Sequence, residues 1–255
     1  MEINEFNYYF KTRSIKNTAL NVGVIVKNLG YSKIDKSKIE RFFELTKEDI
    51  SSDKYIENIS LKIEYKYNTS RQQMEDLCTK LQGKWENYRE EYFQILNKVF
   101  GINVNRDIKE HTYCYLQLLQ INELSLTDNI IYLDASKSED EIFKNFIIML
   151  TKLMLIKRWN YTNCWNFNTE FDVKNKVWLF AEIAIDAIFA NSDLSKISIE
   201  PSYKYLYSLK ILSENVMEHF RKLYAQVALD DFFTEVYMYI HNNYQTLLHF
   251  QHYLY

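Results

Sequence analysis

Glycine and proline are scarce in this sequence. The 255 residues include only 4 Gly and 1 Pro, far below the usual frequencies of about 7% and about 5%. Because tight turns depend on these two residues, their scarcity disfavours a sandwich or propeller built from many short strands and favours long helices. The 47% hydrophobic and 25% charged residues are ordinary proportions for a globular chain, so the disordered and collagen-like classes are excluded.

Cysteine is also rare. Cys78, Cys114 and Cys164 are odd in number, far apart in sequence and in no C-x-x-C arrangement, so neither a disulfide framework nor a structural zinc cluster is indicated. The first ten residues carry Glu2 and Glu5 and lack both a basic start and an apolar run, unlike a signal peptide. We therefore expect a cytoplasmic location.

Long apolar runs and a positive net charge are missing as well. The longest apolar runs, residues 146–156 and 177–190, are interrupted by Lys152 and by Glu182 with Asp186, and both are shorter than the roughly 18 residues that suggest a membrane span. The formal net charge of −3 provides no overall attraction for phosphate backbones. These features predict no membrane span and no nucleic-acid partner, and the 21 Tyr are attributed to compositional bias rather than to base stacking.

Hydrophobic periodicity predicts a mainly helical α+β fold. Residues 61–68 alternate between apolar and polar side chains, which predicts a half-buried strand. Ser70 with Gln73 resembles a capping box that opens a helix ending at Gly101. Two more strands are predicted at residues 112–119 and 129–133, and further helices at residues 36–45, 139–159, 174–191, 203–227 and 230–254.

The order of these elements predicts a small mixed sheet followed by two buried helices and a helical C-terminal region. We divide the chain into an N-terminal segment (1–69), a core (70–200) and C-terminal helices (201–255), all within one continuous domain. No Gly/Ser-rich linker separates the three segments.

Two carboxylates stand alone in the second buried helix. Glu182 and Asp186 are four residues apart in an otherwise apolar run, so they share one face of the helix. An uncompensated buried carboxylate costs at least several kcal/mol, and two of like sign cost more. A metal, a basic side chain, a proton or an array of backbone donors must therefore neutralise them, unless they reach solvent at the helix edge.

The order of the elements in residues 70–191, ending in Glu182-x-x-x-Asp186, resembles the zincin fold of gluzincin metallopeptidases. In that family the first of the two buried helices carries His-Glu-x-x-His, which supplies two zinc ligands and the general base. The second helix carries Glu-x-x-x-Asp, which supplies the third ligand and a carboxylate that orients a ligand histidine. The resemblance implies a zincin-like core in which Glu182 and Asp186 are relics of those groups.

This chain departs from the family at the metal ligands. Lys144-Asn145-Phe146-Ile147-Ile148 stands where the family has His-Glu-x-x-His, and no histidine occurs between residues 112 and 218. A zinc-activated water requires protein ligands and a nearby base. We therefore expect no peptidase activity by the family mechanism and no metal or other cofactor.

A basic side chain could replace the charge of the missing metal. Our hypothesis is that Lys144, at the position of the first ligand histidine, forms a salt bridge with Glu182. Arg158 and Lys157 are competing partners, and solvent exposure of the two carboxylates is the remaining alternative.

The five histidines offer few other sites. His241, His249 and His252 lie at helical spacing near the C-terminus and are candidates for a metal site, although histidines in a last helical turn commonly cap carbonyls. His219 follows the third-ligand helix, where active gluzincins carry an oxyanion-stabilising residue, so it is a candidate relic.

These observations lead to one main functional hypothesis and two alternatives. The main hypothesis is a catalytically inactive metallopeptidase-like protein that binds a protein or a peptide, with residues 112–119 or 129–133 as the edge strand that receives it. The second is an enzyme with altered chemistry in the same cleft, using Glu182, Asp186 and Lys144, with or without a metal held by His111 or His219. The third is a structural or immunity-type interaction protein.

Overall fold

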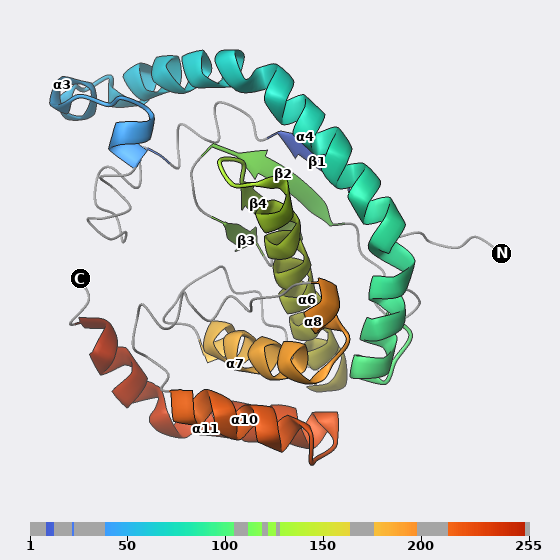
Figure 1. Cartoon of the computed structure of the whole chain (residues 1–255). Coiled ribbons are helices and arrows are strands. Elements are labelled where there is room, and N and C mark those ends of the chain that lie inside the picture. The colour runs from blue at the N-terminus through green and yellow to red at the C-terminus, as the bar shows by residue number, and fades with distance from the viewer. Residues whose placement is uncertain are drawn as a thin grey trace.

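A computed structural model describes residues 9–12, 22, 39–104, 112–118, 122–125, 128–163, 176–197 and 214–252 of the chain. Its architecture is the mainly helical α+β fold with a small mixed sheet that the sequence predicts, and Figure 1 shows the longest helix arching along one side of the sheet and the C-terminal helices lying below it. The buried apolar side chains form a single core cluster. No described helix has the length and apolar character needed to cross a membrane.

The longest element is helix α4 (Tyr55–Phe100), which has 46 residues and arches over the sheet in Figure 1. Short helix α3 (Lys47–Ser51) precedes it, with Thr46 and Asp49 forming a reciprocal capping box. Helix α4 ends at Gly101, whose φ of 63° lies in the left-handed region. Gly101 therefore ends the helix as the sequence predicts.

The strand predicted at residues 61–68 is wrong, because this segment lies inside α4. Ile59, Ile63 and Tyr67 are buried at intervals of one helical turn, whereas Leu61 and Tyr65 are each 66% exposed. Apolar residues on both the buried and the exposed side of the helix thus mimic the alternation of a strand. The capping box expected at Ser70 is likewise absent, since α4 continues unbroken through that residue.

The sheet has four strands in the order β1-β2-β4-β3: β1 (Tyr9–Thr12), β2 (Tyr113–Gln117), β3 (Glu123–Ser125) and β4 (Ile130–Asp134). Strands β1, β2 and β4 are parallel, and β3 pairs antiparallel with β4. The predicted strands at 112–119 and 129–133 correspond to β2 and β4. Both lie inside the sheet, so neither is the predicted edge strand; β3 is the outer strand on that side.

The remaining described helices follow the sheet. Helix α6 (Glu139–Asn163) packs on β4 and on α7 (Lys176–Asn191), and these two helices match the two buried helices of the sequence prediction. After short helix α8 (Leu194–Ile197), helices α10 (Glu214–Tyr224) and α11 (Leu229–His252) both pack against α7. Residues 203–213 of the predicted 203–227 helix lie outside the described part of the chain. Helix α7 is therefore enclosed between α6 on one side and the α10–α11 pair on the other.

Candidate functional site

The candidate site is the contact between α6 and α7, where the family resemblance places the metal. Lys152 of α6 forms an ion pair and hydrogen bond with Glu182 of α7, and their side chains are only 1% and 3% exposed. Ile148 and Ile156, one turn on either side of Lys152, are also buried. The Glu182 carboxylate therefore has its counter-charge in an apolar interior.

The sequence-based hypothesis that Lys144 pairs with Glu182 is wrong, because the partner is Lys152. Lys144 lies two turns before Lys152, half-buried near the start of α6. There Lys84, with a smaller contribution from Lys144, lowers the pKa of the Asp140 carboxyl. A basic side chain does neutralise Glu182, but it comes from a different turn of the helix.

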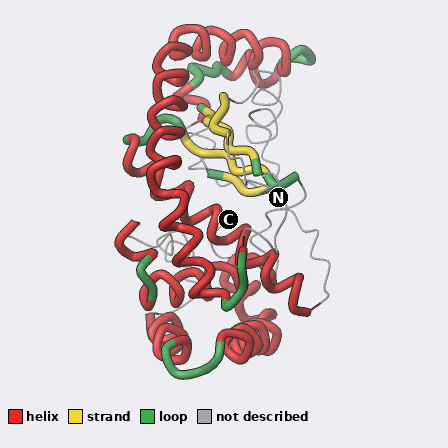
Figure 2. Tube along the Cα trace, turned by 90° about the vertical axis from the view of Figure 1, so that its right-hand side faces the viewer, coloured by secondary structure: helices red, strands yellow, loops and turns green. Residues whose placement is uncertain are grey.

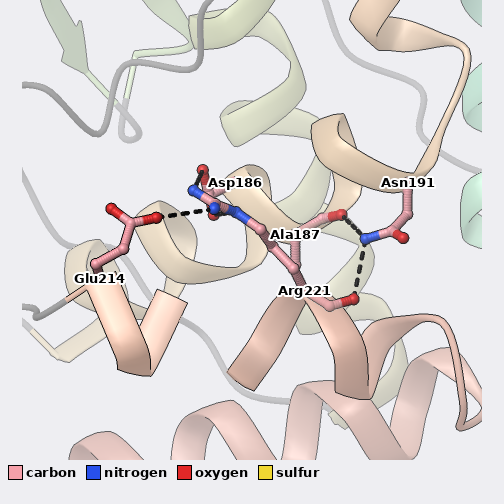
Figure 3. A network of polar contacts seen from close by, with 5 residues as sticks. All are labelled: Asp186, Ala187, Asn191, Glu214 and Arg221. Atoms are coloured by element: carbon pink, nitrogen blue, oxygen red, sulfur yellow. Dashed lines mark hydrogen bonds and ion pairs between the residues drawn. The ribbon is translucent and has the colours of Figure 1, made fainter. Parts of the chain in front are cut away.

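Asp186 is neutralised separately, at the edge of the same helix. Arg221 of α10 donates from Nε to Oδ2 at 2.7 Å and from Nη2 to Oδ1 at 3.1 Å, forming a two-pronged contact. Nη1 of Arg221 also donates to Glu214 Oε1 at 3.1 Å. Figure 3 shows the guanidinium between the two carboxylates. The Asp186 side chain is 2% exposed, and that of Arg221 is 24% exposed.

Burial and pairing oppose each other at Asp186. Desolvation raises the pKa of this carboxyl, and the hydrogen bonds and charge of Arg221 offset only part of the rise. The same contact, led by the hydrogen bond to Asp186, raises the pKa of the Arg221 guanidinium, which stays charged. Both sequence-predicted carboxylates are thus buried and neutralised by basic side chains, and the solvent-exposed alternative is wrong.

Asn191 adds a second link between α7 and α10. Its side-chain amide donates to the carbonyl oxygens of Ala187 at 2.9 Å and of Arg221 at 3.0 Å, as Figure 3 shows. The Arg221 carbonyl is one of the last four of α10, which have no intrahelical partner, and this amide supplies a donor to it. It also holds the backbone of Arg221 in place while the Arg221 side chain reaches Asp186.

The competing basic residues have other positions. Arg158 of α6 donates to the carbonyl of Phe100 at 3.1 Å and to Asp230 at 3.2 Å, and so joins α6 to the end of α4 and the start of α11. Burial lowers the pKa of the neighbouring Lys157 to about 8. The described ion pairs of Glu182 and Asp186 involve Lys152 and Arg221 instead.

The candidate histidines do not gather at this site. His219 is exposed on α10 beside Phe220, and exposed His241 has its Nδ1 3.1 Å from Lys176 Nζ. The side chains of His249 and His252, and all of His111, lie outside the described residues. Within the part of the chain that the structure describes, no group of three His, Cys, Asp or Glu side chains is arranged to hold a metal ion.

Lys152 and Arg221 are the two site residues that sequence reasoning missed. Lys152 interrupts the apolar run of α6 in the same way that Glu182 interrupts that of α7, so two lone opposite charges in neighbouring apolar helices were a usable signal. Arg221 had no comparable signal, because it lies in a strongly polar segment of α10.

Comparisons with protein-family models, with curated proteins and with solved structures found no match. The site must therefore be interpreted from its own chemistry. Glu182 and Asp186 each accept a charge-assisted bond from a buried or half-buried cation, and these bonds occupy the groups that would otherwise serve as a metal ligand or a base. Each carboxylate thus joins α7 to a neighbouring helix through an ion pair.

Proposed function

We propose that this chain is a catalytically inactive, metallopeptidase-like protein that acts by binding a protein or an extended peptide. The observation that carries the proposal is the buried Lys152–Glu182 ion pair. In the gluzincins that the sequence resembles, a metal lies between the two corresponding helices. An ammonium group in that position supplies the positive charge but cannot activate a water molecule as a metal does.

The order of the elements supports the family resemblance. A long helix, a strand, a short antiparallel outer strand, a second strand parallel to the first and two packed helices follow one another from α4 to α7. Two alignments of α6 with the His-Glu-x-x-His pattern place Lys152, the partner of Glu182, at a ligand position. If Lys152 takes the place of the second histidine, the base position is Met149; if it takes the place of the first, the base position is Leu153. Neither side chain can act as a base.

The binding part of the proposal concerns strand β3. Among the described residues β3 pairs with β4 alone, so its outer edge has no strand partner in that part of the chain. Leu124 points into the core, while Ser125 is half-buried. A peptide can add to such an edge through main-chain hydrogen bonds, which bind extended segments of many sequences.

Zinc binding tests the inactive part of the proposal. Protein dialysed against zinc and then freed of loosely held ions should retain less than one zinc per chain and should not cleave a mixed peptide library. The E182Q variant provides the control, because it removes the candidate ligand. One zinc per wild-type chain, lost in E182Q, or zinc-dependent cleavage would contradict the proposal.

N-methylated peptides test the binding part without altering the protein. A peptide selected from a random library should lose most of its affinity when alternate backbone nitrogens, those facing β3, are methylated. The same peptide methylated at the intervening nitrogens should still bind, because those N–H groups face away from the edge. Failure to select any peptide, or equal affinity of the two methylated forms, would exclude strand addition.

A further inference from the structure

Three helices end beside one another on one side of the molecule. Helices α4, α7 and α10 end at Phe100, Asn191 and Tyr224, and Figure 1 shows these ends on the same side. Figure 2 turns that side toward the viewer, with the short loop after α10 at the bottom. An open groove lies between the three ends. The walls of this end groove include Ile95, Lys98 and Val99 of α4, Ala190 of α7, Asp193 after it and Tyr224 of α10.

The end groove is large enough for a small molecule, and part of its wall is apolar. Its volume of about 510 Å³ lies within the range of small-molecule sites, about 300–1,000 Å³. Ile95 and Val99 share one face of α4, because they are four residues apart. The half-buried Tyr224 ring is held by an edge contact with Phe232, with centroids 5.1 Å apart. These groups can receive an apolar part of a ligand.

The same groove carries one positive and one negative side chain. Lys98, in the last turn of α4, forms no ion pair within the described part of the chain. Asp193 Oδ1 pairs with Lys196 at 2.6 Å, and Asp193 Oδ2 accepts no hydrogen bond from the described residues. The hydrogen bond and charge of Lys196 lower the pKa of the Asp193 carboxyl, and the charge of Lys98 adds a smaller contribution. Opposite charges that can still accept a ligand therefore lie near each other in the groove.

We propose that the end groove binds a free α-amino acid with an apolar side chain. Lys98 receives the carboxylate, Asp193 receives the ammonium group, and the side chain lies on the apolar part of the wall. An anion alone would meet Asp193 and the partial negative charges of three helix C-termini, and a cation alone would meet Lys98. A small zwitterion complements both charges, and charge-assisted hydrogen bonds are the stronger kind.

The end groove is preformed and separate from the other sites. The Asn191 amide bridges the carbonyls of Ala187 and Arg221, so it links two of the three helices whose ends form the walls. A site that is already assembled loses less entropy when a ligand binds. The proposal goes beyond peptide binding at β3, because the internal residues of a peptide have neither a free ammonium group nor a free carboxylate.

Isothermal titration calorimetry of the full chain with L-leucine and L-phenylalanine tests the proposal. We expect saturable binding of both amino acids at low salt. L-leucinamide lacks the carboxylate and N-acetyl-L-leucine lacks the ammonium group, so each should bind at least about tenfold more weakly than L-leucine. The A190W variant should also bind L-leucine more weakly, because the indole ring fills the groove without changing a charge.

Two variants identify which residue receives each end of the ligand. K98M should lose the preference for L-leucine over L-leucinamide and keep the preference over N-acetyl-L-leucine. D193N should show the reverse pattern. K196M is the matched control, since it breaks the ion pair between Lys196 and Asp193 but leaves the Asp193 carboxylate in place. It should bind L-leucine at least as tightly as the wild type.

Several results would overturn the proposal. These are no saturable binding of either amino acid below about 10 mM, equal affinity for L-leucine and its two analogues, or unchanged binding in K98M, D193N and A190W. Equal weakening in D193N and K196M would also overturn it, because the lost ion pair would then explain the effect. Binding of N-acetyl-L-leucine as tight as that of L-leucine would indicate an anion site and exclude recognition of a zwitterion.

Discussion

Glu182 and Asp186 lie one turn apart on α7, yet the protein neutralises them in different ways. Glu182 meets a lysine in a closed interior, where both side chains are almost fully buried. Asp186 meets an arginine that is 24% exposed and also contacts Glu214. The first pair depends on a single point charge, and the second on a planar group with several donors. Two carboxylates spaced i and i+4 can thus belong to different environments: a sealed pair, Lys152–Glu182, and a more solvated network of Asp186, Arg221 and Glu214.

The largest effect is expected from breaking the sealed pair. K152M would strand the Glu182 carboxylate in the core and should reduce the free energy of unfolding by about 3–5 kcal/mol. Urea unfolding followed by circular dichroism measures this change. K144M is the control on the same helix and should change stability by less than about 1 kcal/mol. Equal losses in the two variants would contradict the assignment of Lys152.

Replacing both members of the sealed pair sharpens the same point. The K152M/E182L variant should recover most of the stability lost in K152M, because two apolar side chains of similar volume leave no buried charge behind. The double-mutant cycle gives the coupling energy directly. Additive losses would show that Lys152 and Glu182 stabilise the fold independently.

Breaking the Arg221 contact should cost less. R221M is expected to reduce the free energy of unfolding by about 2–3 kcal/mol at neutral pH, because water can enter the space left by the 24%-exposed Arg221 side chain and partly replace its donors to buried Asp186. R221K should recover part of this loss by restoring charge without the two-pronged geometry. An R221M loss larger than that of K152M would reverse the ranking of the two sites.

The pH dependence of the R221M variant provides a further test. The folded-state pKa of Asp186 is already raised by desolvation, and removing Arg221 should raise it further. A carboxyl with a raised folded-state pKa loses its stabilising contribution as the pH rises through that pKa. The stability difference between R221M and the wild type should therefore be large at pH 7 and shrink toward pH 4. A difference independent of pH would indicate lost packing rather than a stranded charge.

The smallest effect is expected at Asn191. N191A removes the amide that joins the carbonyls of Ala187 and Arg221, and should cost about 1 kcal/mol. N191D is the informative partner variant, because a carboxylate cannot donate to two carbonyls and should be the worse substitution. Stability of N191D equal to that of the wild type would show that the bridge contributes little.

The sequence predicted the helical core well because local signals there agree. The apolar runs of α6 and α7 and the glycine after α4 give the same answer at the level of propensity, burial and capping. The N-terminal part of α4 was missed because Leu61 and Tyr65 are apolar or aromatic but exposed, and with the buried residues between them they give the alternating pattern of a strand. Strands β1 and β3, with four and three residues, are too short for a clear period.

The chemistry of the site was predictable only in part. The need for a counter-charge follows from the lone Glu182 and Asp186 in an apolar run. The identity of each partner depends on how α6 and α10 pack against α7. The spacing of residues along the sequence does not specify this packing. The edge of the sheet was assigned wrongly for the same reason, because the position of β3 beyond β4 is a property of the topology.

Helix α4 connects distant parts of the molecule. A helix of 46 residues is about 70 Å long. Near its start Ile59, Ile63 and Tyr67 are buried, while farther along Trp85 contacts Phe146 of α6. Because α4 is one continuous helix that curves around the sheet (Figure 1), its two halves pack on different parts of the core. The helix that buries Ile59 and Ile63 near its start is therefore the same helix that packs on α6, which carries Lys152.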